Sequence, residues 1–315
     1  MINNEKKPVV SVIMNCLNCS EYLKEALDSV FAQTCKGWEI IFWDNGSSDN
    51  SFEIAKSYGP KAKCFRGQET YPLGKARNLA LAQASGKFLA FLDCDDVWLP
   101  EKLEKQTSAF DADSKVGIVF SDAVYFNKKG DVFQLYGRKK PPENYAFRQL
   151  LKGNFLCMSS AVINKKALLS LNQWFDEKFN CIEDLDLFLR IAYEWKLKYV
   201  AGPLVKYRMH EKSLTYGRQS AFAKEGEILV EKLLDLYPNI TKEYGREIES
   251  LQIRIGCQKF VSFWSGGNSK KARQHLQPFL MADKKLFLPY ISSYFFPFSF
   301  FVLILRVFKR KTYSS

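Results

Sequence analysis

The sequence has 315 residues, of which 47% are hydrophobic and 25% are charged. A chain of this length can bury a sizeable core, either as one large domain with an appendage or as two domains. The charged fraction excludes a protein that is wholly embedded in a membrane. The formal net charge of +12 favours an anionic partner, which could be nucleic acid, a nucleotide or a membrane surface.

The positive charge is concentrated near the C-terminus. From residue 251 onward there are eleven Lys and Arg residues and one acidic residue, Asp283. The eight cysteines are scattered, and Cys16 and Cys19 have no second pair at the spacing of a zinc finger. The polar start MINNEKKP is unlike a secretory signal peptide, so we expect a reduced, cytoplasmic compartment.

The first third of the chain alternates predicted strands and helices. Apolar runs predict strands at 9–14, 38–43, 63–65 and 88–92. Ser20 is expected to cap a helix with one apolar side, made of Leu23, Ala26, Leu27, Val30 and Phe31. Further helices are predicted at 48–58 and 73–84. This alternation predicts an α/β fold with a mostly parallel, doubly wound sheet that is covered by helices on both faces. The middle third is mixed, with strands expected at 116–121, 123–126, 159–163 and 204–209, a turn at 128–130 and a helix at 182–194.

From about residue 220 the pattern becomes helical and basic. Residues 286–305 contain no charge and lie between basic clusters, and they are just long enough to span a bilayer. However, Pro289 and Pro297 are expected to break a helix there. We therefore expect the segment 286–308 to lie on a membrane surface through its aromatic and basic residues. A single spanning segment and a buried pair of core helices are the alternatives.

Polar residues gather at the carboxyl ends of the predicted strands, where sheets of this kind bind ligands. Asn15 and Asn18 follow the first strand, DNGSSD at 44–49 follows the second, and Asp93, Asp95 and Asp96 follow the fourth. Carboxylates this close raise one another's pKa unless a cation neutralises them. Mg²⁺ or Mn²⁺ prefers oxygen ligands and also binds phosphates, so the pattern predicts a metal-bound diphosphate. The alternative is a solvated loop in which Asp95 or Asp96 caps the next helix.

Four blocks of the sequence together resemble glycosyltransferase family 2. They are VSVIMNCLNCSEYLKEALDSVFAQT, WEIIFWDNGSSDNS, GKARNLALAQASGKFLAFLDCDDVWLPEKL and EDLDLFLRI, and the resemblance covers roughly residues 8–215. It implies a GT-A fold and an inverting transfer of sugar from a nucleotide diphosphate donor to an acceptor hydroxyl. It also implies a divalent metal cofactor, Mn²⁺ or Mg²⁺.

The resemblance implies roles for individual residues. Asp184 matches the general base, with Glu183 beside it. Asp93 and Asp95 match the DxD motif that touches ribose and metal, and His210 matches a residue near the diphosphate, which makes these three the expected metal set. The implied donor-binding residues are Asn15, Cys16, Asn18, Asp44, Asn45, Arg77, Asp93, Cys94, Asp95 and His210.

The sequence departs from the family pattern at three places. Asn45 stands where a second acid is usual, the stretch 15–18 replaces Pro-Thr-Tyr-Asn, and residues 173–174 (Gln-Trp) replace Gly-Gly. Some motif residues also have simple structural interpretations. The acids at 183, 184 and 186 could offset a helix dipole, which we favour only for Asp186, and Gly74 is interpreted as a turn residue.

We therefore expect a GT-A catalytic domain at 1–215, with a nucleotide-sugar half at 1–98 and an acceptor half at 99–215, followed by a basic helical region at 216–315. The expected enzyme is a hexosyl- or N-acetylhexosaminyltransferase that uses a UDP-sugar in polysaccharide or lipopolysaccharide synthesis. It would be peripheral on the inner face of the cell membrane, with a glycan or lipid-linked acceptor, no nucleic acid partner, and oligomerisation left open.

Two alternative functions remain. A sugar nucleotidyltransferase would need a Gly-rich, basic loop after the first strand, and NCLNCSEYL carries no Gly, Lys or Arg. A non-catalytic nucleotide-sugar or membrane-binding scaffold would tolerate loss of the base. Nucleic-acid binding is disfavoured because the basic residues flank an uncharged aromatic run.

Overall fold

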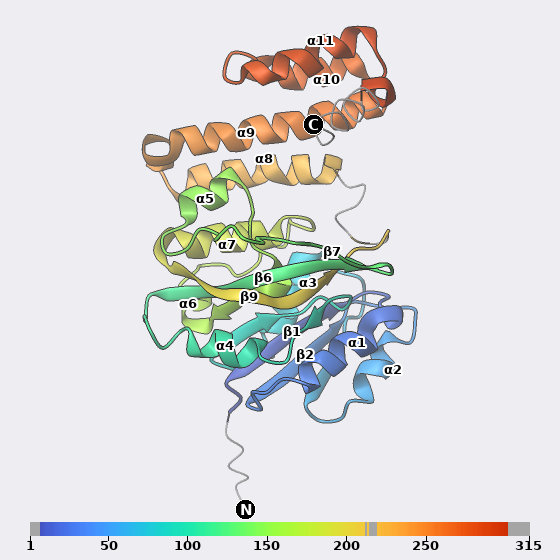
Figure 1. Cartoon of the computed structure of the whole chain (residues 1–315), viewed down its shortest axis with the longest axis vertical. Helices are drawn as coiled ribbons and strands as arrows, with labels where there is room; N and C mark the ends of the chain where they lie inside the picture. Colours follow the sequence, from blue (N-terminus) through green and yellow to red (C-terminus); the bar gives the residue numbers. More distant parts are fainter. Residues whose placement is uncertain (1–6, 212, 214–218, 302–315) are drawn as a thin grey trace, which may run out of the picture. The chain divides into compact units, whose positions relative to one another are not determined.

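The computed structural model describes residues 7–211, 213 and 219–301, and the chain divides into two compact units, Met1–Ser213 and Leu214–Ser315 (Figure 1). The first unit is built on one sheet with the strand order β3-β2-β1-β4-β8-β6-β9-β5, and β7 pairs with β6. The strands are β1 Val10–Cys16, β2 Trp38–Asp44, β3 Ala62–Arg66, β4 Phe88–Phe91, β5 Val97–Trp98, β6 Val116–Asn127, β7 Gly130–Gln134, β8 Val162–Asn164 and β9 Lys196–Arg208.

The strands β1 to β4 pair in parallel, as the alternating pattern predicts. The strand β8 runs antiparallel between β4 and β6, and β6 pairs in parallel with β9. Successive residues of β1, such as Val12 and Ile13, point to opposite faces of the sheet and are both buried, because helices cover both faces. The α/β fold class is therefore confirmed.

The helices of the first unit bury one apolar side each. In α1, for example, Leu23, Ala26, Leu27 and Val30 have no exposed surface, which is the stripe that the sequence predicts. The helices are α1 Ser20–Phe31, α2 Ser51–Lys56, α3 Leu73–Leu81, α4 Lys102–Ser108, α5 Phe147–Lys152, α6 Lys165–Leu169 and α7 Glu183–Glu194.

Three elements differ from the sequence prediction. The strands expected at 116–121 and 123–126 form one strand, β6, which continues into β7 through the predicted turn. The strand expected at 159–163 begins instead as a single 3₁₀ turn, Met158–Ser160, before the short β8. The strand β9 begins eight residues earlier than expected, because its first half pairs with β6 although its side chains are only half-buried.

The second unit is helical among its described residues. Its α9 packs against both α8 and α10 (Figure 1), and Phe260, Trp264, Ala272 and Leu276 form the centre of its core. The helices are α8 Gln219–Leu236, α9 Ile240–Ser265, α10 Ser269–Leu276 and α11 Phe287–Phe295, with 3₁₀ turns at Gln277–Phe279 and Lys284–Leu286.

The aromatic segment near the C-terminus forms a short helix. The expected break at Pro289 is wrong, because this proline lies in the first turn of α11, where its missing N–H is not needed. The helix does end before Pro297, at the extended residue Phe296. No helix within the described residues is long and apolar enough to cross a membrane, and the predicted segment beyond residue 301 lies outside them.

Candidate active site

The carboxyl ends of β1, β2, β3 and β4 form one edge of the sheet, which we call the carboxyl edge. Cys16 at the end of β1 is level with Asp44 of β2, and Asp44 is level with Arg66 of β3. The loops after these strands are joined: the Asn45 N–H donates to the Cys16 carbonyl at 2.8 Å, and the loop after β4 reaches β1 through Cys94. Three polar loops therefore meet at one edge, as the sequence predicts.

The two candidate residues after β2 are both engaged by protein groups. The buried Asp44 carboxylate accepts from Arg66 Nε at 2.6 Å and from the Ser47 N–H at 3.0 Å. The Asn45 amide exchanges two hydrogen bonds with the backbone of Tyr71, at 2.8 and 3.1 Å, and so fixes the segment before α3. Sequence reasoning missed Arg66, although its place at the end of the third strand is the same signal that identified Asp44.

The candidates after β1 mainly organise the loop. Asn18 has a positive φ of 56°, and its Oδ1 accepts from the Ser48 N–H at 2.8 Å, which joins the loops after β1 and β2. Asn15 Nδ2 is buried with no hydrogen-bond partner among the described residues. The Cys16 thiol lies among the thiols of Cys19 and Cys94, and their hydrogen bonds lower its pKa to about 4.

Asp95 and His210 are in direct contact although they are 115 residues apart. His210 Nε2 lies 2.8 Å from Asp95 Oδ2, and the imidazole ring packs on Tyr22 with 5.1 Å between ring centres. The other ring nitrogen, Nδ1, is buried without a hydrogen-bond partner among the described residues. Arg208, two residues before His210, donates from Nε to the Asp95 carbonyl at 2.8 Å and thus holds the two segments together.

Asp96 is a structural residue of this loop. Its buried carboxyl accepts from Ser159 Oγ at 2.5 Å and from the Arg208 N–H at 2.9 Å. Desolvation and the negative charges of Asp95 and Asp93 raise its pKa well above the usual range. The helix-cap alternative is wrong for both aspartates, because α4 begins at Lys102 with Glu101 in the cap position.

Arg77 connects the acids of two motifs. Its Nη2 lies 3.4 Å from Asp93 Oδ1, and its Nη1 lies 3.4 Å from Glu183 Oε1. The guanidinium is buried and lies near the rings of Phe175 and Phe91, at 5.4 and 6.0 Å from their centres. The DxD loop and the start of α7 are therefore brought to one place by a single cation.

The carboxyl groups around Arg77 titrate at raised pKa values. Desolvation and repulsion from Asp95 and Asp184 raise the pKa of Asp93 to about 6 in spite of the favourable Arg77. Because 42% of the Asp93 side chain is exposed, repulsion carries more weight for it than desolvation. Burial, with repulsion from Asp184, raises the pKa of Glu183 to about 7. These acids therefore form a coupled group that an added cation would stabilise.

Asp184 is the half-buried acid at the start of α7. Desolvation raises its pKa, while one carboxylate oxygen accepts from Asn154 Nδ2 at 3.4 Å and the other from the Leu185 N–H at 2.6 Å. A carboxylate with a raised pKa is a better proton acceptor near neutral pH. This position therefore suits a general base, and Asn154 is a neighbour that the sequence did not single out.

Asp186 has a more specific role than balancing the helix dipole. It is fully buried and accepts from Arg190 Nη2 at 2.6 Å and from Nε at 3.1 Å. The same guanidinium donates to the carbonyls of Gln173 and Trp174, the residues that replace the family's two glycines. The ion pair thus fixes the backbone of that substituted stretch.

The expected metal set is only partly assembled. Among residues 7–211, 213 and 219–301, no three His, Cys, Asp or Glu side chains are arranged to hold a metal ion. Asp95 and His210 are adjacent, whereas Asp93 is directed to Arg77. Mg²⁺ and Mn²⁺ sites often use one or two carboxylates and take the remaining ligands from substrate phosphates. The Asp95–His210 pair, with an Nδ1 atom that has no hydrogen-bond partner among the described residues, fits such a site.

The comparisons with known proteins agree with this geometry. The model of the family described as "Glycosyl transferase family 2" matches residues 11–171. The chain belongs to glycosyltransferase family 2. This glycosyltransferase is 32% identical over 219 residues to an uncharacterised glycosyltransferase of Methanocaldococcus jannaschii, an alignment that covers 66% of the chain and 73% of the relative. It is 27% identical over 224 residues (70% and 85%) to an Escherichia coli enzyme, UDP-Glc:alpha-D-GlcNAc-diphosphoundecaprenol beta-1,3-glucosyltransferase.

Solved structures share the fold of this glycosyltransferase. Residues 1–349 of S. aureus TarS in complex with UDP-GlcNAc superimpose with a TM-score of 0.67 at 19% identity, covering 88% of the chain and 82% of that fragment. A mannosyltransferase from Pyrobaculum calidifontis in complex with GDP-Man and Mn²⁺ gives a TM-score of 0.56 at 17% identity, covering 89% and 77%. The GT-A fold is therefore confirmed.

Proposed function

We propose that this glycosyltransferase transfers a hexosyl or N-acetylhexosaminyl group, with inversion, from a UDP-sugar to a hydroxyl of a glycan or lipid-linked acceptor in surface polysaccharide or lipopolysaccharide synthesis. The observation that carries the proposal is the Arg77 bridge, which places the DxD acid Asp93 beside Glu183 and the neighbouring Asp184. The donor and acceptor classes are supported by the E. coli relative, whose name gives UDP-Glc and a lipid diphosphate acceptor, and by the UDP-GlcNAc in TarS.

In this proposal each motif has one task. Asp184, supported by Glu183, accepts the proton of the acceptor hydroxyl, which then attacks the anomeric carbon directly. Asp95 and His210 hold Mn²⁺ or Mg²⁺ together with the donor diphosphate, with Asp93 beside them. The metal, when bound, neutralises the negative charge of the leaving diphosphate. The remaining candidates at the carboxyl edge, from Asn15 to Asn45 and including Cys94, surround the nucleotide.

The proposal assigns residues 1–215 to catalysis, with donor binding in 1–98 and acceptor binding in 99–215. The region 216–315 then places the enzyme on the inner face of the cell membrane. Support for this placement comes from the excess of basic residues after residue 251 and from the exposed aromatic side chains of α11.

Donor hydrolysis by the purified protein tests the reaction. A panel of nucleotide sugars is incubated with Mn²⁺, Mg²⁺ or EDTA, and the released nucleoside diphosphate is measured. We expect release of UDP from one donor, its loss with EDTA, and its loss in Asp95→Asn. The exposed Asp111 provides a matched control, because Asp111→Asn makes the same chemical change away from the carboxyl edge.

The base assignment needs binding and transfer to be separated. Asp184→Asn should bind the donor with an unchanged Kd but lose on the order of 10² to 10⁴ of the transfer rate. A variant that retains transfer would overturn the role of Asp184. If no nucleotide sugar binds with any metal, the scaffold alternative replaces the enzyme, and hydrolysis or synthesis of a nucleoside triphosphate instead would indicate a nucleotidyltransferase.

A further inference from the structure

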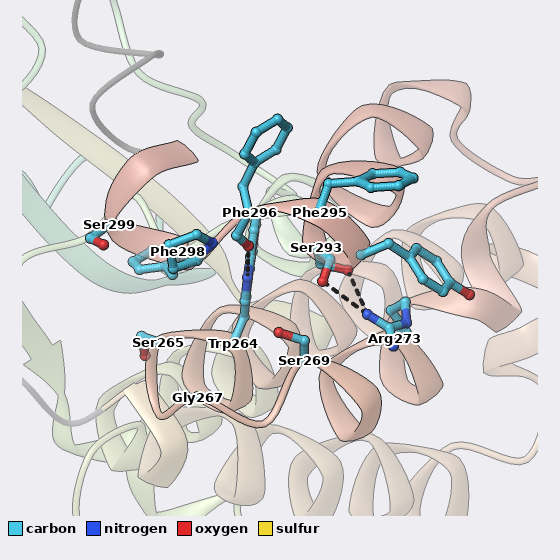
Figure 2. Close-up of a pocket in the computed structure, with 12 residues that line it drawn as sticks. Trp264, Ser265, Gly267, Ser269, Arg273, Ser293, Phe295, Phe296, Phe298 and Ser299 are labelled. Atoms are coloured by element: carbon cyan, nitrogen blue, oxygen red, sulfur yellow. Dashed lines mark hydrogen bonds between the residues drawn. The ribbon is translucent and has the colours of Figure 1, made fainter.

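The second unit contains a pocket that the transfer reaction does not use. It lies between the turn that joins α9 to α10 and the segment from α11 to residue 299, and it has a volume of about 490 Å³ (Figure 2). Its walls combine aromatic rings, hydroxyl groups and one cation. The residues that carry the argument are Trp264, Ser265, Ser269, Arg273, Phe296 and Phe298.

Arg273 is the charged group of this pocket and is held in position by uncharged partners. Its Nη1 donates to the Ser293 carbonyl at 2.9 Å (Figure 2). The guanidinium also stacks on Tyr294, at 3.7 Å from the ring centre. No carboxylate of the described residues forms an ion pair with Arg273, and no Asp or Glu lines the pocket. A positioned guanidinium without a carboxylate partner favours an anionic ligand.

The aromatic wall of the pocket is rigid. Trp264 is almost completely buried, its indole N–H donates to the Phe296 carbonyl at 3.1 Å, and its ring packs edge-on against Phe298 at 5.4 Å (Figure 2). Ser265, at the end of α9, and Ser269, at the start of α10, also line the pocket. Because Ser265 Oγ donates to the Ser262 carbonyl at 3.0 Å, the pocket offers a ligand an apolar wall, the Arg273 guanidinium and the hydroxyl of Ser269.

The surface beside the pocket is strongly apolar. On α11 the side chains of Leu288, Ile291, Tyr294 and Phe295 are 52% to 74% exposed. Continuous exposed apolar surface of this kind marks an interaction site. The basic residues Lys270 and Lys271 on α10, which packs against α11, and Lys284 and Lys285 just before α11 flank it. Apolar side chains flanked by lysines are typical of a helix that lies in the headgroup region of an anionic membrane.

We propose that this pocket binds the phosphate of an anionic phospholipid headgroup. Arg273 contacts the phosphate, and the exposed side of α11 inserts among the lipids next to the pocket. A guanidinium matches a phosphate in shape and charge, because two of its N–H groups can donate to two phosphate oxygens. Nucleic acid would provide the same phosphate, but it would leave the apolar surface of α11 exposed to water. The inference rests on the membrane location in the proposed function and is independent of the transfer chemistry.

A matched pair of variants separates the pocket from general attraction to a charged surface. Ser269→Asp places a carboxylate in the pocket wall one helical turn before Arg273, where it can pair with the guanidinium in place of a phosphate, and it is favourable at the first turn of α10. Lys271→Gln lies on the same helix outside the pocket. Both variants lower the net charge by one, so an unspecific electrostatic attraction would weaken by the same amount in each.

Vesicle flotation of the full chain is the measurement. The vesicles contain phosphatidylcholine alone or phosphatidylcholine with phosphatidylglycerol, and thermal unfolding checks that each variant is folded. We expect the wild-type chain to float with the acidic vesicles, Lys271→Gln to lose about fivefold in affinity, and Ser269→Asp to lose at least tenfold more than that. Arg273→Lys, which keeps the charge but not the planar group, should also bind more weakly than Lys271→Gln.

Several outcomes would overturn the inference. If Ser269→Asp and Lys271→Gln lose the same affinity for acidic vesicles, binding is a general attraction to a charged surface and needs no pocket. If Arg273→Lys binds vesicles as tightly as the wild type, the pocket has no specific site for a guanidinium–phosphate contact. If free glycerol phosphate displaces the protein from vesicles at the concentration of accessible phosphatidylglycerol, the site binds soluble phosphate and not a lipid. If the chain binds no vesicle while UDP release persists, the membrane placement fails and the proposed reaction stands.

Discussion

Lys102 is a buried amine in the first unit, and its titration provides a sharp test of the structure. It begins α4 with no exposed surface, donates from Nζ to Gln106 Oε1 at 2.6 Å, and lies 4.2 Å from the ring centre of Trp98. No carboxylate of the described residues forms an ion pair with it. Burial lowers its pKa from 10.5 to about 7, so the folded protein favours the neutral amine while the unfolded chain keeps the proton.

The sign and size of the effect follow from this difference in pKa. Between pH 7 and pH 10.5 the unfolded chain binds one more proton than the folded chain, so the free energy of unfolding rises with pH by about 1.4 kcal/mol per unit. Below pH 7 the amine is protonated in the folded chain too, and holding this buried charge costs about 5 kcal/mol of the free energy of unfolding. Lys102→Met removes this penalty but loses the ring contact, about 1 kcal/mol, and leaves Gln106 without one partner, about 2 kcal/mol.

We therefore predict that Lys102→Met is about 2 kcal/mol more stable than the wild type at pH 6, and that this advantage disappears near pH 8.5. Urea unfolding of both proteins from pH 6 to 8.5, followed by tryptophan fluorescence, gives the difference directly, and groups that titrate in both proteins cancel. Lys105→Met is the control, because Lys105 lies on the same helix but pairs with Glu101 at the surface. A difference between wild type and Lys102→Met that does not change with pH would refute the reasoning.

Three further changes test other contacts in the same unit. The folded-state pKa of Glu183 is raised to about 7, so its stabilising contribution is present below pH 4.5 and is lost as pH rises to 7. Wild type should consequently lose about 3 kcal/mol relative to Glu183→Gln between pH 5 and pH 8 in urea unfolding, and parallel pH curves would contradict this. Arg190→Met removes the cation of the buried pair with Asp186 and should destabilise the protein by about 3 to 5 kcal/mol, whereas adding Asp186→Asn should recover part of the loss in thermal unfolding. Gly74→Ala would place a Cβ 2.3 Å from the Asp176 carbonyl oxygen and should cost about 1 to 3 kcal/mol, so an unchanged Tm would show that this packing is wrong.

The centre of the parallel part of the sheet could be predicted because β1 and β4 are nearly continuous apolar runs that are buried on both faces. The strand β9 shows the limit of that signal. Its first half contains Lys196, Lys198 and Gly202, and it becomes a strand by pairing with β6, about 80 residues earlier in the chain. Local pattern carries no information on such a pairing, so only the apolar end of β9 was expected.

In the candidate site, the positions of the acidic residues could be predicted from the sequence, but their ion-pair partners were not. The place of Asp44 and Asp93 could be predicted, because both follow buried strands whose carboxyl ends share one edge. Which side chain pairs with which was not predicted: Arg66 stands at the end of β3, where the same signal could have found it, whereas the contact of Arg77 with Asp93 arises only through the fold. Gly74 was interpreted wrongly as a turn residue: it lies in the first turn of α3, where a missing side chain allows close contact with another loop.

The contact between Asp95 and His210 has a consequence for how the enzyme is made. The acidic loop after β4 leaves the ribosome long before the imidazole, and the residues that hold the two together, Asp96 and Arg208, are just as far apart in the chain. Synthesis must pass the end of β9 before the pair exists at all. A chain cut short before that point would contain Asp95 without its His210 partner, so the candidate metal pair is completed only late in translation.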